Sequence, residues 1–580
     1  MIKVSDYIAK RLKEKYKTDK VFMVSGGGAM HLNDSFGKFI PYIANHHEQA
    51  SSIAAEGYAR VNQKLAVVNV TTGPGGLNCL NGVFGQWTDS VPVLYISGQV
   101  KTSTCLSSCP DLNLRQLGDQ EVDIVSVVKP ITKYAKMVTE PNEIKYHLDK
   151  AIYEATTGRF GPVWFDIPIN VQSAMIDEND LKEFVPEKKT LDFDISEVIN
   201  RLNKAEKPLI ISGHGIRLSD TISQFKNFVK NTNIPAVTTF NSMDMFETDD
   251  KNFVGRIGTV GQRAGNFALQ NADFILCLGT RNNIRQVSYN WENFGKNAFK
   301  VVVDIDKSEL EKPLVKPDLW VNADLKDFIP KLCDAEIKSF DNKWLDFCKN
   351  LQEKYSFKNV EEYKSKEKIN VYDFVHTLTC CMKDNDILVA ANGSACVCLH
   401  QVGVVKKNQR IIFNSGDASM GYDLPASLGA CVASEQPVIC LAGDGSIMMN
   451  IQELQTIKHN NLPVKIFVIN NNGYSSIRQT QKNFFEGRMT ASGEDSGVSV
   501  PDFCKVSNAF GIDSVRLDNP QNMKEIINKV LNYDKPVLCE VMTEQEYIFQ
   551  PKLSSRINPD GSMTSPALDD MYPFIEKEIY

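Results

Sequence analysis

The sequence lacks the features that mark several classes of protein. No apolar run in its 580 residues is long enough to span a bilayer. No apolar core of signal-peptide length follows the lysine- and arginine-rich segment Met1 to Tyr16, so we expect a cytoplasmic protein with no membrane partner. The net charge is −7 and the pI is near 5.8, which gives no support for a nucleic-acid partner.

Cysteines and histidines at metal-ligand spacing are also missing. The 14 cysteines contain no paired CxxC set, so we expect reduced and mostly buried thiols. The eight histidines lack ligand spacing as well. His46 and His47 precede Glu48, where either contact with substrate or a structural role is consistent with the sequence.

What the sequence does have is the composition of a globular protein, with 42% hydrophobic and 23% charged residues. A chain of this length predicts several domains rather than one. We expect α/β units at residues 1–176, 193–335 and 369–545, polar connectors at 177–192 and 353–368, and a tail at 546–580. The tail is predicted either to fold over the active site as a lid or to be disordered.

The most informative segment reads as strand, turn, helix, strand and turn. Gly443-Asp444-Gly445-Ser446 follows one apolar run, and Asn471-Asn472-Gly473-Tyr474 follows another. Between them Ile451, Leu454 and Ile457 recur at helical spacing. In a right-handed crossover both turns emerge at the carboxyl edge of adjacent parallel strands. The pattern therefore predicts that Asp444 and Asn471 lie close together.

These two side chains offer a carboxylate and an amide oxygen, which are hard ligands suited to Mg²⁺. Gly443 and Gly445 allow close backbone approach, and the helix N-terminus behind Ser446 favours negative charge. The alternative is an ordinary turn, because a lone Gly-Asp-Gly forms tight turns readily.

The complete pattern, Gly-Asp-Gly followed by Asn-Asn at this spacing, resembles the signature of thiamine diphosphate enzymes. The resemblance implies that Asp444 and Asn471 hold a Mg²⁺ ion that bridges the cofactor's diphosphate. It also implies the Gly473 carbonyl as a third metal ligand. The remaining residues that it places at the cofactor in this segment are Gly443, Gly445, Ser446 and Tyr474.

A second resemblance covers residues 20–100, which are similar to the pyrimidine domain of acetolactate synthase and its relatives. Glu48 stands where the family has the glutamate that activates the aminopyrimidine ring. Taken alone, Glu48 is an acid that opens a helix and is favoured by the helix dipole. The resemblance further implies that Thr72 contacts the cofactor, that Gly27 and Gly28 leave room beside the thiazolium, and that Gln120 lies near it.

The resemblance extends over nearly the full chain, so we expect three doubly wound parallel-sheet domains that bind the pyrimidine, form the centre and bind the diphosphate. Asn414 to Pro425 is similar to the family block at the middle of the cofactor. There Met420 would prop thiamine in its bent conformation and the Ala418 carbonyl would face the aminopyrimidine amine. Ser394 is also implied at the cofactor. Ordinary core filling is the alternative for Met420.

The central domain resembles the region that holds FAD in acetolactate synthases. Arg281 follows the strand Phe274 to Gly279, and Asp304 ends the next apolar strand. These two residues and Asp324 are the implied flavin contacts. A strand that ends in an acid can bind ribose hydroxyls, but it can also end in a plain turn.

The activity implied is that of a carboligase that uses thiamine diphosphate and Mg²⁺. It would decarboxylate a 2-oxoacid, pyruvate first of all, and transfer the two-carbon unit to a carbonyl acceptor. The resemblance implies a homodimer or homotetramer with the active site between subunits. A hypothesis of another class is a non-catalytic thiamine-binding protein that has kept the fold.

The acceptor is less constrained by the sequence. Residues 100–120 contain no histidine, which weakens simple decarboxylation as the reaction. Segments 474–479 and 483–488, which are expected to shape the acceptor pocket, differ from biosynthetic acetolactate synthases. Together with tail segments 554–556 and 569–574, they look more like relatives that add a two-carbon unit to a keto-sugar nucleotide. Arg478 or Arg488 is predicted to pair with a phosphate or carboxylate, and an exposed arginine with no specific role is the alternative.

Overall fold

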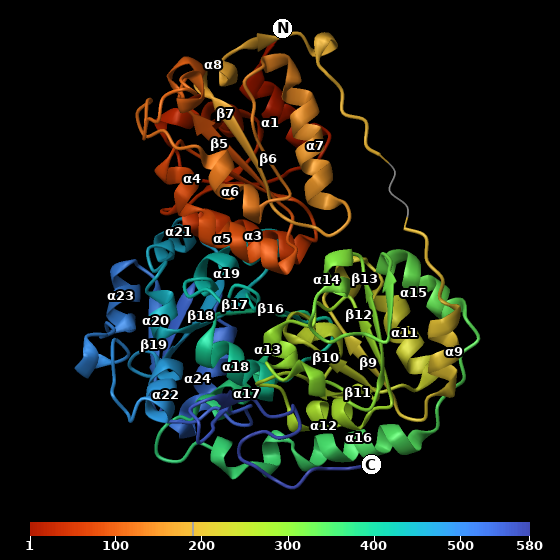
Figure 1. Cartoon of the computed structure of the whole chain (residues 1–580). Helices are drawn as coiled ribbons and strands as arrows, with labels where there is room; N and C mark the ends of the chain where they lie inside the picture. The colour runs from red at the N-terminus through yellow and green to blue at the C-terminus, as the bar shows by residue number, and fades with distance from the viewer. Residues whose placement is uncertain (188–190) are drawn as a thin grey trace.

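The computed structural model describes residues 1–187 and 191–580. Figure 1 shows three α/β units joined by long connections, with the N-terminal unit standing above the other two. Each unit contains one six-stranded sheet whose strands all run parallel. The predicted fold class is therefore confirmed. The predicted connector at 177–192 includes residues 188–190, which lie outside the described residues.

The first unit has the strand order β3-β2-β4-β5-β7-β6. Its strands are β2 (Val21–Met23), β3 (Tyr42–Ala44), β4 (Ala66–Val70), β5 (Val93–Gln99), β6 (Tyr134–Met137) and β7 (Val163–Pro168). Its helices are α1 (Val4–Glu14), α2 (Met30–Phe39), α3 (Glu48–Asn62), α4 (Pro74–Asn78), α5 (Leu80–Asp89), α6 (Ile124–Val128), α7 (Ile144–Thr156) and α8 (Ile169–Gln172). Strands β4, β5 and β7 are buried along their whole length, as expected of a parallel sheet covered on both faces.

The second unit has the order β11-β10-β9-β12-β13-β14. Its strands are β9 (Pro208–Ser212), β10 (Ala236–Thr238), β11 (Phe253–Arg256), β12 (Phe274–Leu278), β13 (Phe299–Asp304) and β14 (Leu319–Asn322). Its helices are α9 (Ser196–Lys204), α10 (Gly215–Leu218), α11 (Ile222–Thr232), α12 (Arg263–Asn271), α13 (Ile284–Val287), α14 (Lys307–Glu311), α15 (Leu325–Asp334) and α16 (Asn342–Lys354). The strand order reverses between β9 and β12, which makes that point a crevice at the carboxyl edge.

The third unit has the order β16-β15-β17-β18-β20-β19. Its strands are β15 (Ile387–Ala390), β16 (Arg410–Phe413), β17 (Val438–Gly443), β18 (Val464–Asn470), β19 (Asp513–Leu517) and β20 (Val537–Met542). Its helices are α17 (Val371–Cys381), α18 (Gly393–Val402), α19 (Asp423–Ser434), α20 (Asp444–Ile447), α21 (Glu453–His459), α22 (Ser475–Phe484), α23 (Phe503–Ala509) and α24 (Met523–Leu531). The predicted helix between the two polar turns is α21, which begins after Ile451 because turns occupy the residues before Glu453.

Helices α3 and α19 join the first and third units. A Cβ added at Gly57 would lie 2.1 Å from the Ala426 carbonyl oxygen, and one added at Gly429 would lie 1.8 Å from that of Ala54. The two helices therefore pack in backbone contact and run antiparallel. One hydrophobic core continues across this junction from the first sheet to the third.

The tail follows β20 and crosses to the second unit. It carries a short hairpin of β21 (Arg556–Ile557) and β22 (Met563–Thr564), and β1 (Ile2–Lys3) pairs with β8 (Met175–Ile176) elsewhere. Arg263 donates hydrogen bonds to the carbonyls of Met571 and Pro573. The Tyr580 ring meets Trp344 edge-on. The tail thus contacts the second unit. No described helix combines the length and apolarity that crossing a membrane requires.

Candidate active site

The two polar turns of the third unit meet at the carboxyl edge of its sheet. Strands β17 and β18 are paired neighbours, and Asp444 and Asn471 directly follow them. Asp444 Oδ2 accepts hydrogen bonds from the backbone N–H groups of Asn471 at 3.0 Å and Gly473 at 2.9 Å. Its Oδ1 accepts one from Gly445 at 2.7 Å. Asp444 therefore holds both turns in one arrangement, as the crossover predicts.

The oxygens at this edge fit a hard divalent cation. Asn471 Oδ1 is buried and has no hydrogen-bond partner within the described part of the chain. The Asp444 carboxyl is 2% exposed, and burial raises its pKa to about 6 against the opposing effect of the three backbone bonds. An unpartnered amide oxygen beside a desolvated carboxylate is the donor set that Mg²⁺ prefers.

The surroundings of the turn leave little freedom for substitution. A Cβ added at Gly445 would lie 2.2 Å from the Tyr474 ring and 3.3 Å from the Met420 methyl carbon. Ser446 Oγ donates to Asp423 Oδ2 at 2.5 Å and accepts from the Gly421 N–H at 2.9 Å. The Ser446 hydroxyl thus ties the turn to the start of α19.

The residues expected at the middle of the cofactor lie beside this turn. Ala418 has a φ of +59°, and its carbonyl accepts a hydrogen bond from Asn392 Nδ2 at 2.6 Å. Met420 packs on Gly445. Ser394, in the first turn of α18, shares a hydrogen bond with the Tyr547 hydroxyl. Gly443 has open space around it, since an added Cβ would meet nothing within 4 Å.

A second group of predicted residues gathers at the carboxyl edge of the first sheet. A Cβ added at Gly28 would lie 2.0 Å from Thr72 Oγ1, and one added at Gly73 would lie 1.8 Å from the Gln120 carbonyl oxygen. An added Cβ at Gly27 would meet nothing within 4 Å. Glu48 opens α3 and accepts a hydrogen bond from Asn78 Nδ2 at 2.9 Å. The chain thus brings its predicted catalytic residues together at this edge.

The two groups are held apart within one chain. Asp423 at the start of α19 touches the Gly-Asp-Gly turn through Ser446, whereas Glu48 starts the antiparallel helix α3. A rise of 1.5 Å per residue puts Glu48 about 18 Å along α3 from the level of Asp423.

The three residues predicted for a flavin line one cavity. It lies at the carboxyl edge of the second sheet, where the strand order reverses between β9 and β12. Arg281 Nη2 is 3.6 Å from Asp89 Oδ1, and Asp324 caps α15. Burial raises the pKa of Asp304 to about 6. Gly215 and Gly279 line the same cavity, and their backbones are in contact.

Comparison with known proteins agrees with this division into three. Residues 2–127 match the model of the thiamine pyrophosphate enzyme N-terminal TPP binding domain, 195–332 the central domain and 391–541 the C-terminal TPP binding domain. The acetolactate synthase large subunit of Lactococcus lactis subsp. lactis (strain IL1403) is 31% identical, covering 96% of this chain and 95% of the relative. Isozyme 2 of Escherichia coli (strain K12) is 30% identical, covering 95% and 96%.

The chain belongs to the acetolactate synthase-like family of thiamine pyrophosphate enzymes. The family prediction is confirmed. Glu48 falls in the match to the N-terminal TPP binding domain, and Asp444 and Asn471 fall in the match to the C-terminal one. The roles of the individual residues remain predictions.

One residue of the site escaped the sequence patterns. Tyr547 lies beyond the segment that matches the C-terminal domain model. Its buried hydroxyl contacts Ser394 Oγ and lies 3.3 Å from Asn471 Nδ2. The only sequence signal was an aromatic residue shortly after the last strand of the sheet, which is not specific. Packing of the segment after β20 against α18 is what brings Tyr547 to Asn471.

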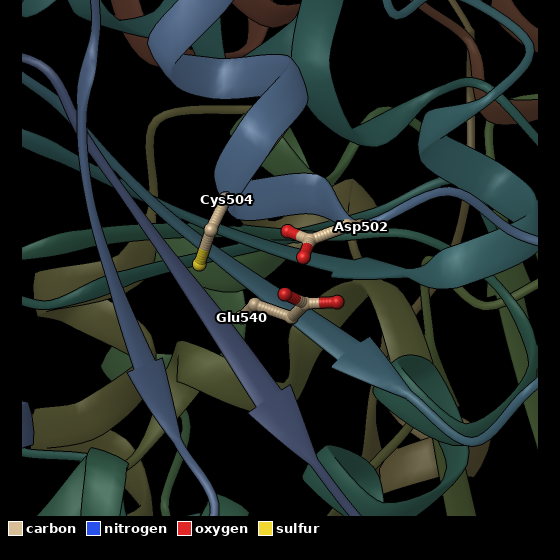
Figure 2. Close-up of side chains that lie close together, drawn as sticks. All are labelled: Asp502, Cys504 and Glu540. Atoms are coloured by element: carbon tan, nitrogen blue, oxygen red, sulfur yellow. The ribbon is translucent and has the colours of Figure 1, made fainter.

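A different cluster of possible metal ligands lies between α23 and β20. Asp502 and Cys504, at the start of α23, approach Glu540 of β20 (Figure 2). Arg516 Nη2 lies 2.8 Å from an oxygen of each of the two carboxylates. Because one guanidinium already bridges both acids, we assign the cluster to an ion-pair network that fastens α23 to the sheet.

Proposed function

We propose that this enzyme is a carboligase that uses thiamine diphosphate and Mg²⁺, decarboxylates pyruvate and transfers the two-carbon unit to a carbonyl acceptor. The observation that carries the proposal is the buried, unpartnered Asn471 Oδ1 beside the Asp444 carboxylate. The family membership and the name acetolactate synthase of its relatives support the choice of reaction. A cytoplasmic location belongs to the same proposal.

The residues proposed to act in the reaction lie at the carboxyl edges of the first and third sheets. Asp444, Asn471 and the Gly473 carbonyl would hold the metal ion, and Ser394 would stand beside the diphosphate. Bound thiamine diphosphate supplies the electron sink for loss of carbon dioxide. Glu48 would exchange a proton with the pyrimidine ring nitrogen. Met420, packed on Gly445, would shape the wall on which the middle of the cofactor rests.

We propose a homodimer or homotetramer in which Glu48 serves the metal site of another copy. The separation of about 18 Å along α3 supports this arrangement. An apolar surface supports it as well, because Phe84 and Trp87 of α5 and Met449 after the Gly-Asp-Gly turn are 37–48% exposed. Asn81 of α5 contacts Ser419, which joins the two parts of this surface. Large exposed apolar residues at such a junction favour burial against a second copy.

The cavity of the second unit is proposed to hold FAD in a structural role. Its position at the reversal of strand order is the usual place for a dinucleotide. Arg281 is placed to meet phosphate, and Asp304 or Asp324 to meet ribose hydroxyls. Flavin absorbance of the purified protein would support FAD binding. So would loss of that absorbance in Arg281→Ala, provided that the thermal stability of the apoprotein is unchanged. Protein saturated with free FAD that retains none after gel filtration would contradict it.

The central test uses Glu48→Gln and labelled pyruvate. The variant should still bind thiamine diphosphate and Mg²⁺, measured by quenching of tryptophan fluorescence, but should lose turnover by a factor of about 10² or more. Products from a panel of acceptors, including keto-sugar nucleotides, identify the acceptor by mass. Acetolactate alone supports the synthase reaction, and a branched sugar supports acetyl transfer to a sugar nucleotide. Wild type that releases no carbon dioxide from any 2-oxoacid would overturn the proposal.

A further inference from the structure

A cavity lies between helix α22 and the segment that follows β20. Its walls share a surplus of hydrogen-bond donors and positive charge. The residues that line it are Ser475, Arg478, Gln479, Lys482, Asn483, Gln545, Glu546, Tyr547, Ile548 and Lys552. Ser475 and Tyr547 place one end of this cavity next to Asn471 and the metal site.

Three cations face one acid in this cavity. Glu546 is already paired with Lys482, and both of these side chains are largely exposed. Arg478 bonds to carbonyl oxygens, those of Asn471, Asn472, Ser492 and Gln545, and forms no ion pair with an acid among the described residues. The cavity therefore carries net positive charge.

Lys552 is the cation best placed for a ligand. Burial lowers its pKa, and no described carboxylate forms an ion pair with it. A desolvated ammonium without a counter-ion costs free energy that a bound anion would recover. Lys552 is also held by its backbone, because it exchanges two hydrogen bonds with Tyr572.

Gln479 adds a donor with a fixed direction. Its Oε1 accepts a hydrogen bond from the Phe549 N–H at 3.1 Å, which determines which end of the amide is the oxygen. The Nε2 atom is buried and has no partner in the part of the chain that the structure describes. An unpartnered buried donor in a positive cavity requires an acceptor from a ligand or a water molecule.

We propose that this cavity binds a phosphate group of the acceptor substrate, with Lys552 and the Gln479 amide as its contacts. This inference rests on the proposed carboligase function and narrows it to phosphorylated acceptors, such as keto-sugar nucleotides. A phosphate offers acceptor oxygens on every side and negative charge, which matches walls made of donors and cations. The position beside Tyr547 puts the bound group next to the cofactor site, within the span of a nucleotide-linked sugar.

The test measures binding of inorganic phosphate and of UDP to the enzyme loaded with thiamine diphosphate and Mg²⁺, by isothermal titration calorimetry. Gln479→Glu keeps the acceptor for the Phe549 N–H and replaces the free donor with a negative charge. We expect this variant to lose phosphate binding. Lys552→Gln should weaken it about tenfold or more, since hydrogen bonds to charged groups are among the strong ones. The KM for a phosphorylated acceptor should rise by a similar factor in Lys552→Gln.

Lys349→Gln is the matched control. Lys349 is also partly buried with a pKa lowered by burial, but it lines another cavity, so phosphate affinity should not change. Equal phosphate affinity in wild type and both cavity variants would overturn the inference. Phosphate binding that occurs only in the absence of thiamine diphosphate would also overturn the inference, because the phosphate would then be occupying the site of the cofactor's own diphosphate. Carbon dioxide release from pyruvate by wild type, measured separately, tests the proposed function itself.

Discussion

At the scale of single residues, the proposed metal site depends on the orientation of one amide. Asn471 would present either its oxygen or its NH₂ group to a metal ion held by Asp444, depending on how its side chain is turned. Tyr547 lies 3.3 Å from Asn471 Nδ2 and leaves Oδ1 free and buried. A contact of this kind from outside the ligand set orients the ligand and tunes metal affinity. We therefore propose Tyr547 as a positioning residue for the proposed metal ligand Asn471.

Tyr547→Phe keeps the ring and removes only the hydroxyl. We expect the affinity for Mg²⁺ in the presence of thiamine diphosphate to fall about tenfold or more, because contacts that orient metal ligands commonly contribute 10- to 100-fold. Titration of Mn²⁺ followed by electron paramagnetic resonance measures this without reference to turnover.

Tyr363→Phe is the control for that experiment. The Tyr363 hydroxyl donates to the Gln550 carbonyl at 2.7 Å, so it fastens the same segment of chain without touching Asn471. Its metal affinity should stay at the wild-type value. Equal metal affinity in Tyr547→Phe and wild type would remove Tyr547 from the site.

At the scale of elements, the antiparallel pair α3 and α19 connects the two cofactor-binding units. The pair is close because glycines face backbone carbonyls on both helices. It also buries charge: Glu56 Oε1 accepts hydrogen bonds from Arg60 Nε at 2.9 Å and from the Tyr422 hydroxyl at 3.0 Å. Glu56 Oε2 has no partner among the described atoms. The junction therefore combines tight packing with an incompletely satisfied carboxylate.

Gly429→Ala should destabilise this junction. The new Cβ would start 1.8 Å from the Ala54 carbonyl oxygen, so the helices must separate. Overpacking of this kind costs about 1–3 kcal/mol, measured by denaturant unfolding. Gly37→Ala in α2 is the control, because its Cβ would meet only Tyr42 at 3.9 Å. The control should be neutral or stabilising by up to about 1 kcal/mol.

Glu56 predicts a pH dependence at the same junction. Burial raises its pKa from 4.5 to about 7, so the folded protein keeps a proton that the unfolded chain releases. The stability from this group is complete below pH 4.5 and is lost as the pH rises through about 7. Glu56→Gln cannot ionise, so its free energy of unfolding should decline less between pH 5 and pH 8, by up to about 3 kcal/mol. Parallel pH profiles for variant and wild type would contradict this.

At the scale of the whole molecule, one chain carries two half-sites that face different ways. The pyrimidine edge with Glu48 and the metal edge with Asp444 lie at opposite ends of the α3 and α19 pair. In the proposed symmetric dimer, each half-site would meet its complement and two equivalent active sites would form. The proposal therefore predicts that activity requires a second copy of the chain.

Mixing two inactive variants tests this arrangement. Glu48→Gln and Asp444→Ala chains, unfolded and refolded together in equal amounts, should regain about a quarter of wild-type activity, because half of the dimers are hybrids with one intact site each. Each variant alone should remain inactive. No recovery in a mixture that sedimentation shows to be dimeric would mean that Glu48 serves the metal site of its own chain.

The sequence was most informative where local pattern and shared motif coincide. The apolar runs before Asp444 and Asn471 predicted paired parallel strands, and the structure places both side chains at one edge. Tyr547 could not be found in this way, and Gln479 was predicted only as part of a segment, 474–479, expected to shape the acceptor pocket. Their importance depends on how the segment after β20 packs on α18 and α22, which no spacing along the chain encodes.

The predicted flavin contacts could be found only partly from the sequence; they are Arg281, Asp304 and Asp324. Strand ends and a resemblance marked them as a group, but only the order of the sheet shows that they line one cavity at the reversal between β9 and β12. The tail was harder to predict from sequence. Its polar composition was consistent with disorder, but Arg263 and Asn271 of α12 donate hydrogen bonds to its carbonyl oxygens. Composition alone does not reveal such partners.

The sequence by itself determined the family and the three parallel sheets, and it predicted the pair of oxygen ligands, because motifs, apolar runs and polar turns are local features of the chain. The tertiary structure decided the rest: which end of the Asn471 amide meets Tyr547, how far Glu48 stands from the start of α19, and where positive charge is left without a counter-ion. These depend on contacts between segments remote in sequence, and such contacts are set by packing and burial of the whole fold.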